Sequence, residues 1–186
     1  MQLPDENSVE ICGNTVIFSG KYGMMGPDGE MHSVAVAPYT DTRRFNRKSG
    51  VPGMQAHHVA QNAIYGKIIR KADGIAVSLF GSALTDWGSP HNRAHVCGEQ
   101  QLDTYRKSGT SPTNNTMYEI YARELQAAGL DQTVIEYVLY RTIQQQMEHG
   151  LLPDMPIPRM PRKIYFRKSR GGMYHEKVSE EQRERT

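Results

Sequence analysis

The stretch GIAVSLFGSALTDWGSPHNRAHVCGEQQ, residues 74–101, decides the fold class. Apolar and smaller residues alternate from Ile75 to Leu79, which is typical of a half-buried strand. Ser89 and Pro90 then begin a helix, because serine accepts a hydrogen bond at the N-cap and proline has no N–H to lose at the first helical position. A strand and a helix joined by a short loop predict an α+β domain.

The segments before this stretch predict strands and one loop. Val9–Phe18 and Met31–Pro38 are rich in Val, Ile and Thr, and the turn residues 26–29 (GPDG) lie between them, so we expect an N-terminal β-hairpin. Residues 40–53 (TDTRRFNRKSGVPG) are expected to form a loop, and Met54–Val59 a short extended segment.

Helices dominate the segments after it. Cap and stop residues predict helices over residues 90–105, 117–128 and 131–147. Prolines at positions 153, 156, 158 and 161 exclude a further helix, and residues 179–186 (SEEQRERT) are expected to form a frayed tail.

Composition excludes several classes of protein. A length of 186 residues allows one domain with a small appendage. The two cysteines, Cys12 and Cys97, are too few for a disulfide scaffold and lack the spacing of a thiolate zinc site. No apolar run approaches the roughly 18 residues that span a bilayer, and MQLPDENSVE lacks the basic and apolar regions of a signal peptide. We therefore expect neither a membrane protein nor a classical signal peptide.

Charge is arranged in blocks along the chain. Residues 41–71 carry seven Lys or Arg and one acid, and residues 159–170 carry six and none, whereas residues 72–158 carry five bases and ten acids. Two basic blocks around an acidic middle suit a phosphate backbone as partner, although an ordinary solvated surface has the same composition.

Four of the seven histidines fall into two tight groups. His91 and His95 lie four residues apart on the helix that Ser89 begins, so both imidazoles project from one face and can share a metal ion. His57 and His58 end an extended segment, where consecutive side chains point to opposite sides. One of them can therefore face the metal while the other faces a substrate.

This combination suits hydrolysis. Three neutral imidazoles with an open fourth position are typical of a catalytic divalent-metal site, and a fourth histidine off the metal can deprotonate water. A metal ion and a general base are what hydrolysis of a phosphodiester requires. Cys97 lies about 200° around the helix from His95 and is expected in the core. Glu99 is a candidate acceptor for an imidazole N–H, or else a solvated residue.

Five segments together carry a resemblance to a known family. They are GMQAHHVAQNAIYG (53–66), GIAVSLFGSAL (74–84), WGSPHNRAHVCGEQQLDTYR (87–106), SPTNNTMY (111–118) and IPRMPRK (157–163). In combination they resemble the HNH/endonuclease VII nuclease toxin domains of bacterial polymorphic toxins, including C-terminal domains of Rhs and type VI secretion effectors. The histidine groups are also similar to those of the colicin DNases, in which a ββα-metal (His-Me finger) core holds one divalent ion.

The resemblance implies a role for each histidine of the two groups. The metal ligands would be His57, His91 and His95. His58 would be the general base, and Asn62 matches the asparagine that orients this base in many HNH enzymes. Gln55 stands where the colicin-like enzymes have an acid near the ligands. The ion itself is open among Zn²⁺, Mg²⁺, Ni²⁺ and Mn²⁺.

The resemblance also implies how the chain is organised. Residues 51–163 would be the nuclease domain, residues 1–50 a hairpin or linker extension, and residues 164–186 a basic and then polar tail, with additional C-terminal helices after the ββα core. The implied function is that of an antibacterial endonuclease toxin, released by a specialised secretion system from a parent effector. It would cleave nucleic acid, double-stranded DNA above all, in the cytoplasm of a target cell, and a cognate immunity protein would neutralise it.

The basic residues nearest the histidines are the first candidates for phosphate contact. These candidates are Lys67, Arg70, Lys71 and Arg93, and the second candidates are Arg43, Arg44, Arg47 and residues 159–170. Two alternatives stay open: a metal-dependent hydrolase of RNA or of another phosphoester, and a non-enzymatic binding module with a structural zinc. HExxH is absent, which argues against a metalloprotease. A zinc site closed by all four histidines would indicate the binding module.

Overall fold

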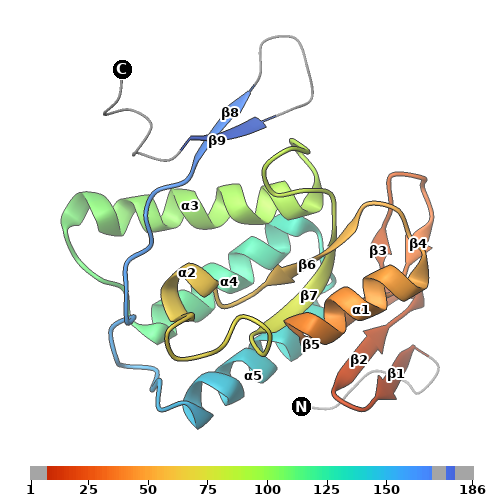
Figure 1. The fold of residues 1–186 in the computed structure, drawn as a ribbon, viewed down its shortest axis with the longest axis horizontal. Coiled ribbons are helices and arrows are strands. Elements are labelled where there is room, and N and C mark those ends of the chain that lie inside the picture. Colours follow the sequence, from red (N-terminus) through yellow and green to blue (C-terminus); the bar gives the residue numbers. More distant parts are fainter. Residues whose placement is uncertain (1–7, 169–174, 179–186) are drawn as a thin grey trace.

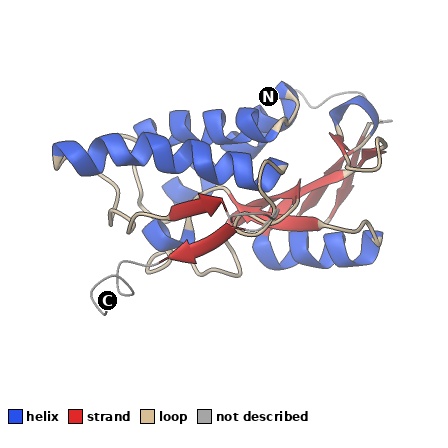
Figure 2. Cartoon of the chain, turned by 90° about the horizontal axis from the view of Figure 1, so that it is seen from above, coloured by secondary structure: helices blue, strands red, loops and turns tan. Residues whose placement is uncertain are grey.

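The computed structural model describes residues 8–168 and 175–178 and has an α+β fold, as the sequence predicts. Its middle layer is an antiparallel sheet of five strands in the order β1-β2-β5-β7-β6. These strands are β1 (Val9–Cys12), β2 (Thr15–Phe18), β5 (Val34–Pro38), β6 (Met54–His58) and β7 (Ile75–Phe80). Helices cover both faces of the sheet (Figures 1 and 2).

Three long helices lie where the cap residues predict them. They are α3 (Pro90–Ser108), α4 (Asn114–Ala128) and α5 (Gln132–Glu148). Ser89, Thr113 and Asp131 each accept a hydrogen bond at the corresponding N-cap. The core between these helices and β7 is formed by fully buried side chains, among them Leu79, Leu102, Met117, Leu125 and Val138.

The N-terminal strands differ from the single hairpin that the sequence predicts. Gly13 and Asn14 divide the first stretch into β1 and β2, because Gly13 has a φ of 60° and suits a type II′ turn. Residues 26–29 do form a turn, but it joins β3 (Met24–Met25) and β4 (Met31–His32), which follow the 3₁₀ turn η1 (Gly20–Tyr22). Strand β5 then pairs with β2 and with β7, so the N-terminal segment and the strand bearing His57 share one sheet.

Residues 40–53 contain a helix, α1 (Tyr39–Ser49), and the prediction of a loop there is wrong. The inner face of α1 is polar: Thr42 and Asn46 are buried one turn apart against the sheet. Ser78 on β7 donates to Asn46 Oδ1 at 2.6 Å, and its Oγ accepts from the backbone N–H of Ala35 at 3.1 Å. Tyr39 and Phe45 are the only large apolar residues of α1, which is too few to predict a core-facing helix from the sequence.

Strand β7 is buried on both faces, which corrects the prediction of a half-buried strand. Helix α1 covers the face that carries Ser78, and α5 reaches the other, where Gln145 Oε1 accepts from the N–H of Ile75 at 3.1 Å. The alternation of larger and smaller side chains along β7 therefore reflects packing against α5 on one face and α1 on the other, and not a core face and a solvent face.

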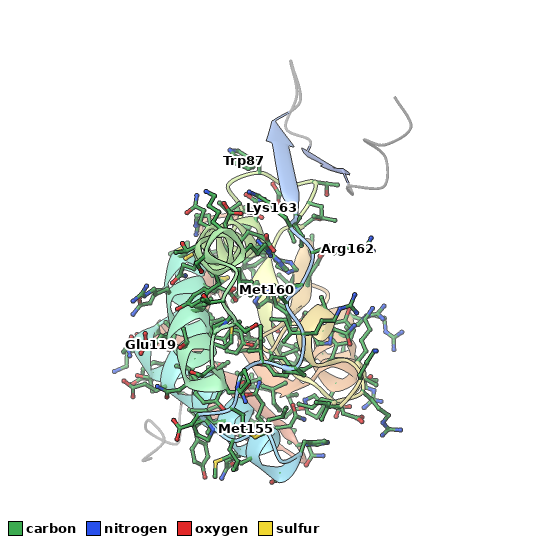
Figure 3. All side chains as sticks on the ribbon, turned by 90° about the vertical axis from the view of Figure 1, so that its left-hand side faces the viewer. Trp87, Glu119, Met155, Met160, Arg162 and Lys163 are labelled. Atoms are coloured by element: carbon green, nitrogen blue, oxygen red, sulfur yellow. The ribbon has the colours of Figure 1, made fainter. Side chains whose placement is uncertain are left out.

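The described chain after α5 forms no further helix, as its prolines predict, and it crosses α3, which residues 161–164 contact (Figures 1 and 3). Arg106 Nε donates to the carbonyl of Pro161 at 3.1 Å, and Lys163 Nζ donates to Asp103 at 2.7 Å. Strands β8 (Tyr165–Lys168) and β9 (His175–Val178) then pair antiparallel. The predicted tail, residues 179–186, lies outside the described residues, as do residues 169–170 of the second basic block. Within the described ranges, no helix is long and apolar enough to cross a membrane.

Candidate metal centre

His57, His91 and His95 lie together, as the sequence predicts. One ring nitrogen from each falls within 4.8 Å of the other two. The ring centroid of His57 lies 5.1 Å from that of His91 and 4.9 Å from that of His95. Strand β6 supplies the first imidazole, and the first two turns of α3 supply the others. Cys97, which is expected in the core, is instead half-buried; it lies outside this group, and its Sγ accepts from the amide of Gln101.

Burial favours the neutral form of two of these imidazoles, His57 and His91. Burial lowers the pKa of His57 well below its ordinary value, and the neighbouring His95 and His91 lower it further. Burial also lowers the pKa of His91. Its Nδ1–H donates to the carbonyl of Gly81 at 3.1 Å, which leaves the lone pair of Nε2 available to bind a metal ion. Neutral imidazole is the form that binds metal ions.

His57 itself has no hydrogen-bond partner in the described part of the chain. Its side chain is 1% exposed, and neither Nδ1 nor Nε2 is bonded. A buried polar atom without a partner is unfavourable by about 1–3 kcal/mol. A divalent cation bound by the three nitrogens would give one of the two ring nitrogens of His57 a partner, so the residues present fit such an ion.

Glu124 on α4, which the sequence did not predict as a site residue, lies next to this group. This carboxylate is 1% exposed, and its Oε2 lies 4.0 Å from His57 Nε2. Burial raises the pKa of Glu124 well above its ordinary value, and a hydrogen bond with Gln61 acts in the opposite sense. Gly98 on α3 makes the approach possible, because a Cβ at this position would collide with Glu124 Oε1.

A signal for Glu124 exists in the sequence. Glu124 falls on the apolar face of a predicted helix, where an acid is unusual. Its neighbours on this face are Met117, Tyr121, Leu125 and Ala128. Glu99, the acid that the sequence suggests as an imidazole acceptor, is instead bonded to Arg106 at 2.9 Å and to the N–H of Ile164 at 3.2 Å.

His58 lies on the other face of the sheet. It pairs across the strands with Ala76, whereas His57 pairs with Val77, so the two imidazoles diverge as expected. The Nε2–H of His58 donates to the carbonyl of Lys71 at 2.9 Å, and its ring stacks on Tyr39 with centroids 3.9 Å apart. Burial lowers the pKa of His58. The neutral ring therefore presents Nδ1 as a proton acceptor.

Asn62 begins the short helix α2 (Asn62–Tyr65) and lines the same narrow hollow as His58. In the described structure no hydrogen bond joins their side chains. The imidazole is oriented by the Lys71 carbonyl and by Tyr39, neither of which a sequence motif identifies.

The four basic residues predicted to contact phosphate have different surroundings. Arg93 donates to the carbonyls of Ala127 and Ala128 at 2.7 and 3.0 Å, so it caps the end of α4. Arg70 is paired with Asp73 at 2.6 Å. Lys67 and Lys71 are exposed, and neither forms an ion pair with a described residue.

Comparisons with protein-family models, curated proteins and solved structures found no significant match to this chain.

Proposed function

We propose that this chain is a metal-dependent endonuclease that hydrolyses phosphodiester bonds of double-stranded DNA. The observation that carries the proposal is the convergence of three imidazoles from β6 and α3, with a fourth histidine held away from them by the Lys71 carbonyl. The succession of two antiparallel strands, β6 and β7, and a helix bearing His91 and His95 also supports it, because this is the order of a ββα-metal core.

The chemistry divides between the two faces of β6. A divalent ion on His57, His91 and His95 would stabilise the charge that develops on the phosphate and the leaving oxygen. Nitrogen donors favour Zn²⁺ or Ni²⁺ over Mg²⁺. His58 Nδ1 would accept the proton of the attacking water, and the bond from Nε2–H to Lys71 keeps the ring in the tautomer that can do so.

We extend this proposal to an antibacterial role on the resemblance of residues 51–163 alone. The chain would then be the toxic domain of a larger secreted effector, acting in the cytoplasm of a competitor and inhibited by a cognate immunity protein.

A structural zinc site in a binding module is the second candidate, and one observation favours it. The centre is largely buried, and Glu124 Oε2 lies 4.0 Å from His57 Nε2, so a shift of this carboxylate toward the ion would complete a closed set of four ligands. In such a site no open position would remain for a phosphate oxygen.

One experiment separates the two candidates. The purified protein is incubated with plasmid, linear DNA and total RNA, with and without EDTA, and Zn²⁺, Ni²⁺, Mn²⁺ or Mg²⁺ is then restored. Cleavage that needs the metal and is lost in His58→Ala supports the endonuclease. Cleavage of RNA and not of DNA would support an endonuclease whose substrate is RNA. Metal-dependent thermal stability without cleavage of any nucleic acid would support the structural zinc site.

A further inference from the structure

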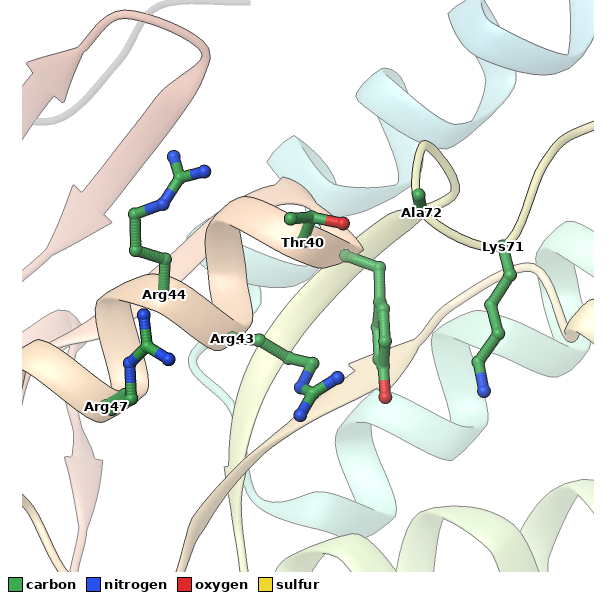
Figure 4. A pocket seen from close by; sticks show the side chains of 7 residues that line it. Thr40, Arg43, Arg44, Arg47, Lys71 and Ala72 are labelled. Carbon is green, nitrogen blue, oxygen red and sulfur yellow. The ribbon is translucent and has the colours of Figure 1, made fainter.

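A basic groove lies on the α1 face of the sheet, away from the metal centre. It consists of two adjoining hollows of about 560 and 460 Å³ that share Tyr39, Arg43 and Arg47. Lys71 and Arg44 line the first hollow, and β6 residues 54–56 line the second. Figure 4 shows the side chains of Arg43 on α1 and Lys71 on the loop before β7 with their tips inclined toward each other.

The charge in this groove is largely uncompensated. Arg43, Arg47 and Lys71 form no ion pair with any described residue, whereas Arg44 is paired with Asp41 at 2.7 Å. Asp41 is the single carboxylate on α1. Fixed cations in a concave surface attract a polyanion more strongly than cations on a convex one, because the field is focused there.

The groove adjoins His58 through Tyr39, which lines both hollows. Tyr39 stacks on the His58 ring, and the Arg43 guanidinium and the Lys71 ammonium lie 5.8 and 5.7 Å from the centre of the Tyr39 ring. Arg43 and Arg47 are one helical turn apart, about 6 Å along the axis. That separation is close to the spacing of successive phosphates along one nucleic-acid strand.

We propose that this groove binds the sugar–phosphate backbone of the nucleic acid, with Arg43, Arg47 and Lys71 each contacting a phosphate. The inference rests on the proposed endonuclease function and places the strand on the His58 side of β6. Two of these residues belong to α1, outside the segments that carry the family resemblance. The groove therefore differs from the phosphate-binding surface that the sequence predicts. Two residues of that predicted surface have other partners: Arg70 is paired with Asp73, and Arg93 donates to the carbonyl of Ala127.

The test measures binding separately from cleavage. Fluorescence anisotropy in EDTA follows the binding of labelled duplex DNA, single-stranded DNA and RNA over a series of salt concentrations. The groove variant is Arg43→Gln/Arg47→Gln/Lys71→Gln. The matched control, Lys21→Gln/Lys107→Gln/Arg123→Gln, removes the same charge from exposed positions on other elements.

We expect the groove variant to bind more weakly and its plot of log K against log salt to be shallower by roughly two to three, since each phosphate contact contributes a slope of about −0.9 on B-DNA. The control should keep the slope of the unmodified protein. If the triple variant does not fold, the single variant Lys71→Gln, which leaves α1 unchanged, should make the slope shallower by about one.

Each other outcome would overturn the inference. An unchanged slope in the groove variant, while the unmodified protein still cleaves nucleic acid, would reject the groove and leave the endonuclease proposal intact. Equal losses in the groove and control variants would mean that net charge alone drives binding. An unmodified protein that neither binds nor cleaves nucleic acid would overturn both proposals, and binding of an acidic protein to the groove would then be the competing explanation.

Discussion

His57 and Glu124 are neighbouring residues that each bury polar atoms without a hydrogen-bond partner in the described structure. His57 has two unbonded ring nitrogens, and Glu124 Oε1 has no hydrogen-bond partner among the described residues. Their side chains approach to 4.0 Å in a space that only Gly98 leaves open. Both observations are consistent with a centre arranged for a cation.

Glu124→Gln should weaken metal binding by about 10- to 100-fold, which is the usual effect of removing a carboxylate that supports a ligating histidine. The metal-free variant should unfold at nearly the same denaturant concentration as the unmodified protein, because burial already favours the neutral carboxyl group. Isothermal titration with Zn²⁺ and urea unfolding in EDTA measure the two effects. Unchanged affinity would show that Glu124 has no part in the centre.

His58→Ala should reduce cleavage by roughly 10² to 10⁴ while metal affinity stays nearly unchanged, because a general base acts on water and need not ligate. Plasmid nicking is measured beside calorimetric metal binding. His149→Ala is a matched control, since this exposed ring is bonded only to the carbonyl of Gln145 on its own helix. A large loss of metal affinity in His58→Ala would contradict the separation of the two histidines.

At the scale of elements, α1 decides how the candidate site is enclosed. It packs on β5, β6 and β7, covers the face that carries His58, and contributes Tyr39 to the stack on that ring. Its buried contacts are hydrogen bonds: Thr42 donates to the carbonyl of Ala37 at 3.2 Å, and Asn46 accepts from Ser78.

Asn46→Ala should destabilise the protein by about 1–3 kcal/mol, since it leaves the buried Ser78 hydroxyl without its acceptor. Urea unfolding measures the change. Lys48→Ala, on the exposed side of the same helix, should stay within about 0.5 kcal/mol of the unmodified protein. Equal small effects in both variants would mean that α1 is not held to the sheet by this contact.

At the scale of the whole molecule, the candidate metal centre links β6 to α3, elements that are separated by β7 along the chain. An ion that binds only the folded state stabilises it by mass action, about 2.7 kcal/mol at a free concentration 100 times the dissociation constant. Zn²⁺ or Ni²⁺ should therefore raise the unfolding temperature, and His91→Ala and His95→Ala should each abolish the increase. An increase that survives in both variants would place the ion elsewhere.

The stability of the metal-free protein should also depend on pH. The folded-state pKa values of His57 and His91 lie below 6.5, so as pH falls through this value the unfolded chain gains protons that the folded chain does not. Stability is then lost by up to about 1.4 kcal/mol per pH unit for each histidine.

Glu124 contributes with the opposite sign, because its raised pKa makes its contribution fall as pH rises above about 4.5. Urea unfolding in the Glu124→Gln background therefore isolates the histidines. Adding His57→Gln to this background should make the pH dependence less steep, while the contribution of His91 remains. A dependence that is already flat in Glu124→Gln would contradict the burial of neutral imidazoles.

The three long helices, the H-x3-H pair and the divergence of His57 from His58 follow from the sequence alone. All of these depend on interactions between residues within a few positions of one another: N-caps, glycine stops, helical periodicity and strand alternation. Only the tertiary structure decided the position of Glu124 beside His57, the helical state of α1 and the stack of Tyr39 on His58. These depend on contacts between distant parts of the chain, such as Gly98 with Glu124, and on polar burial that only a covering element stabilises.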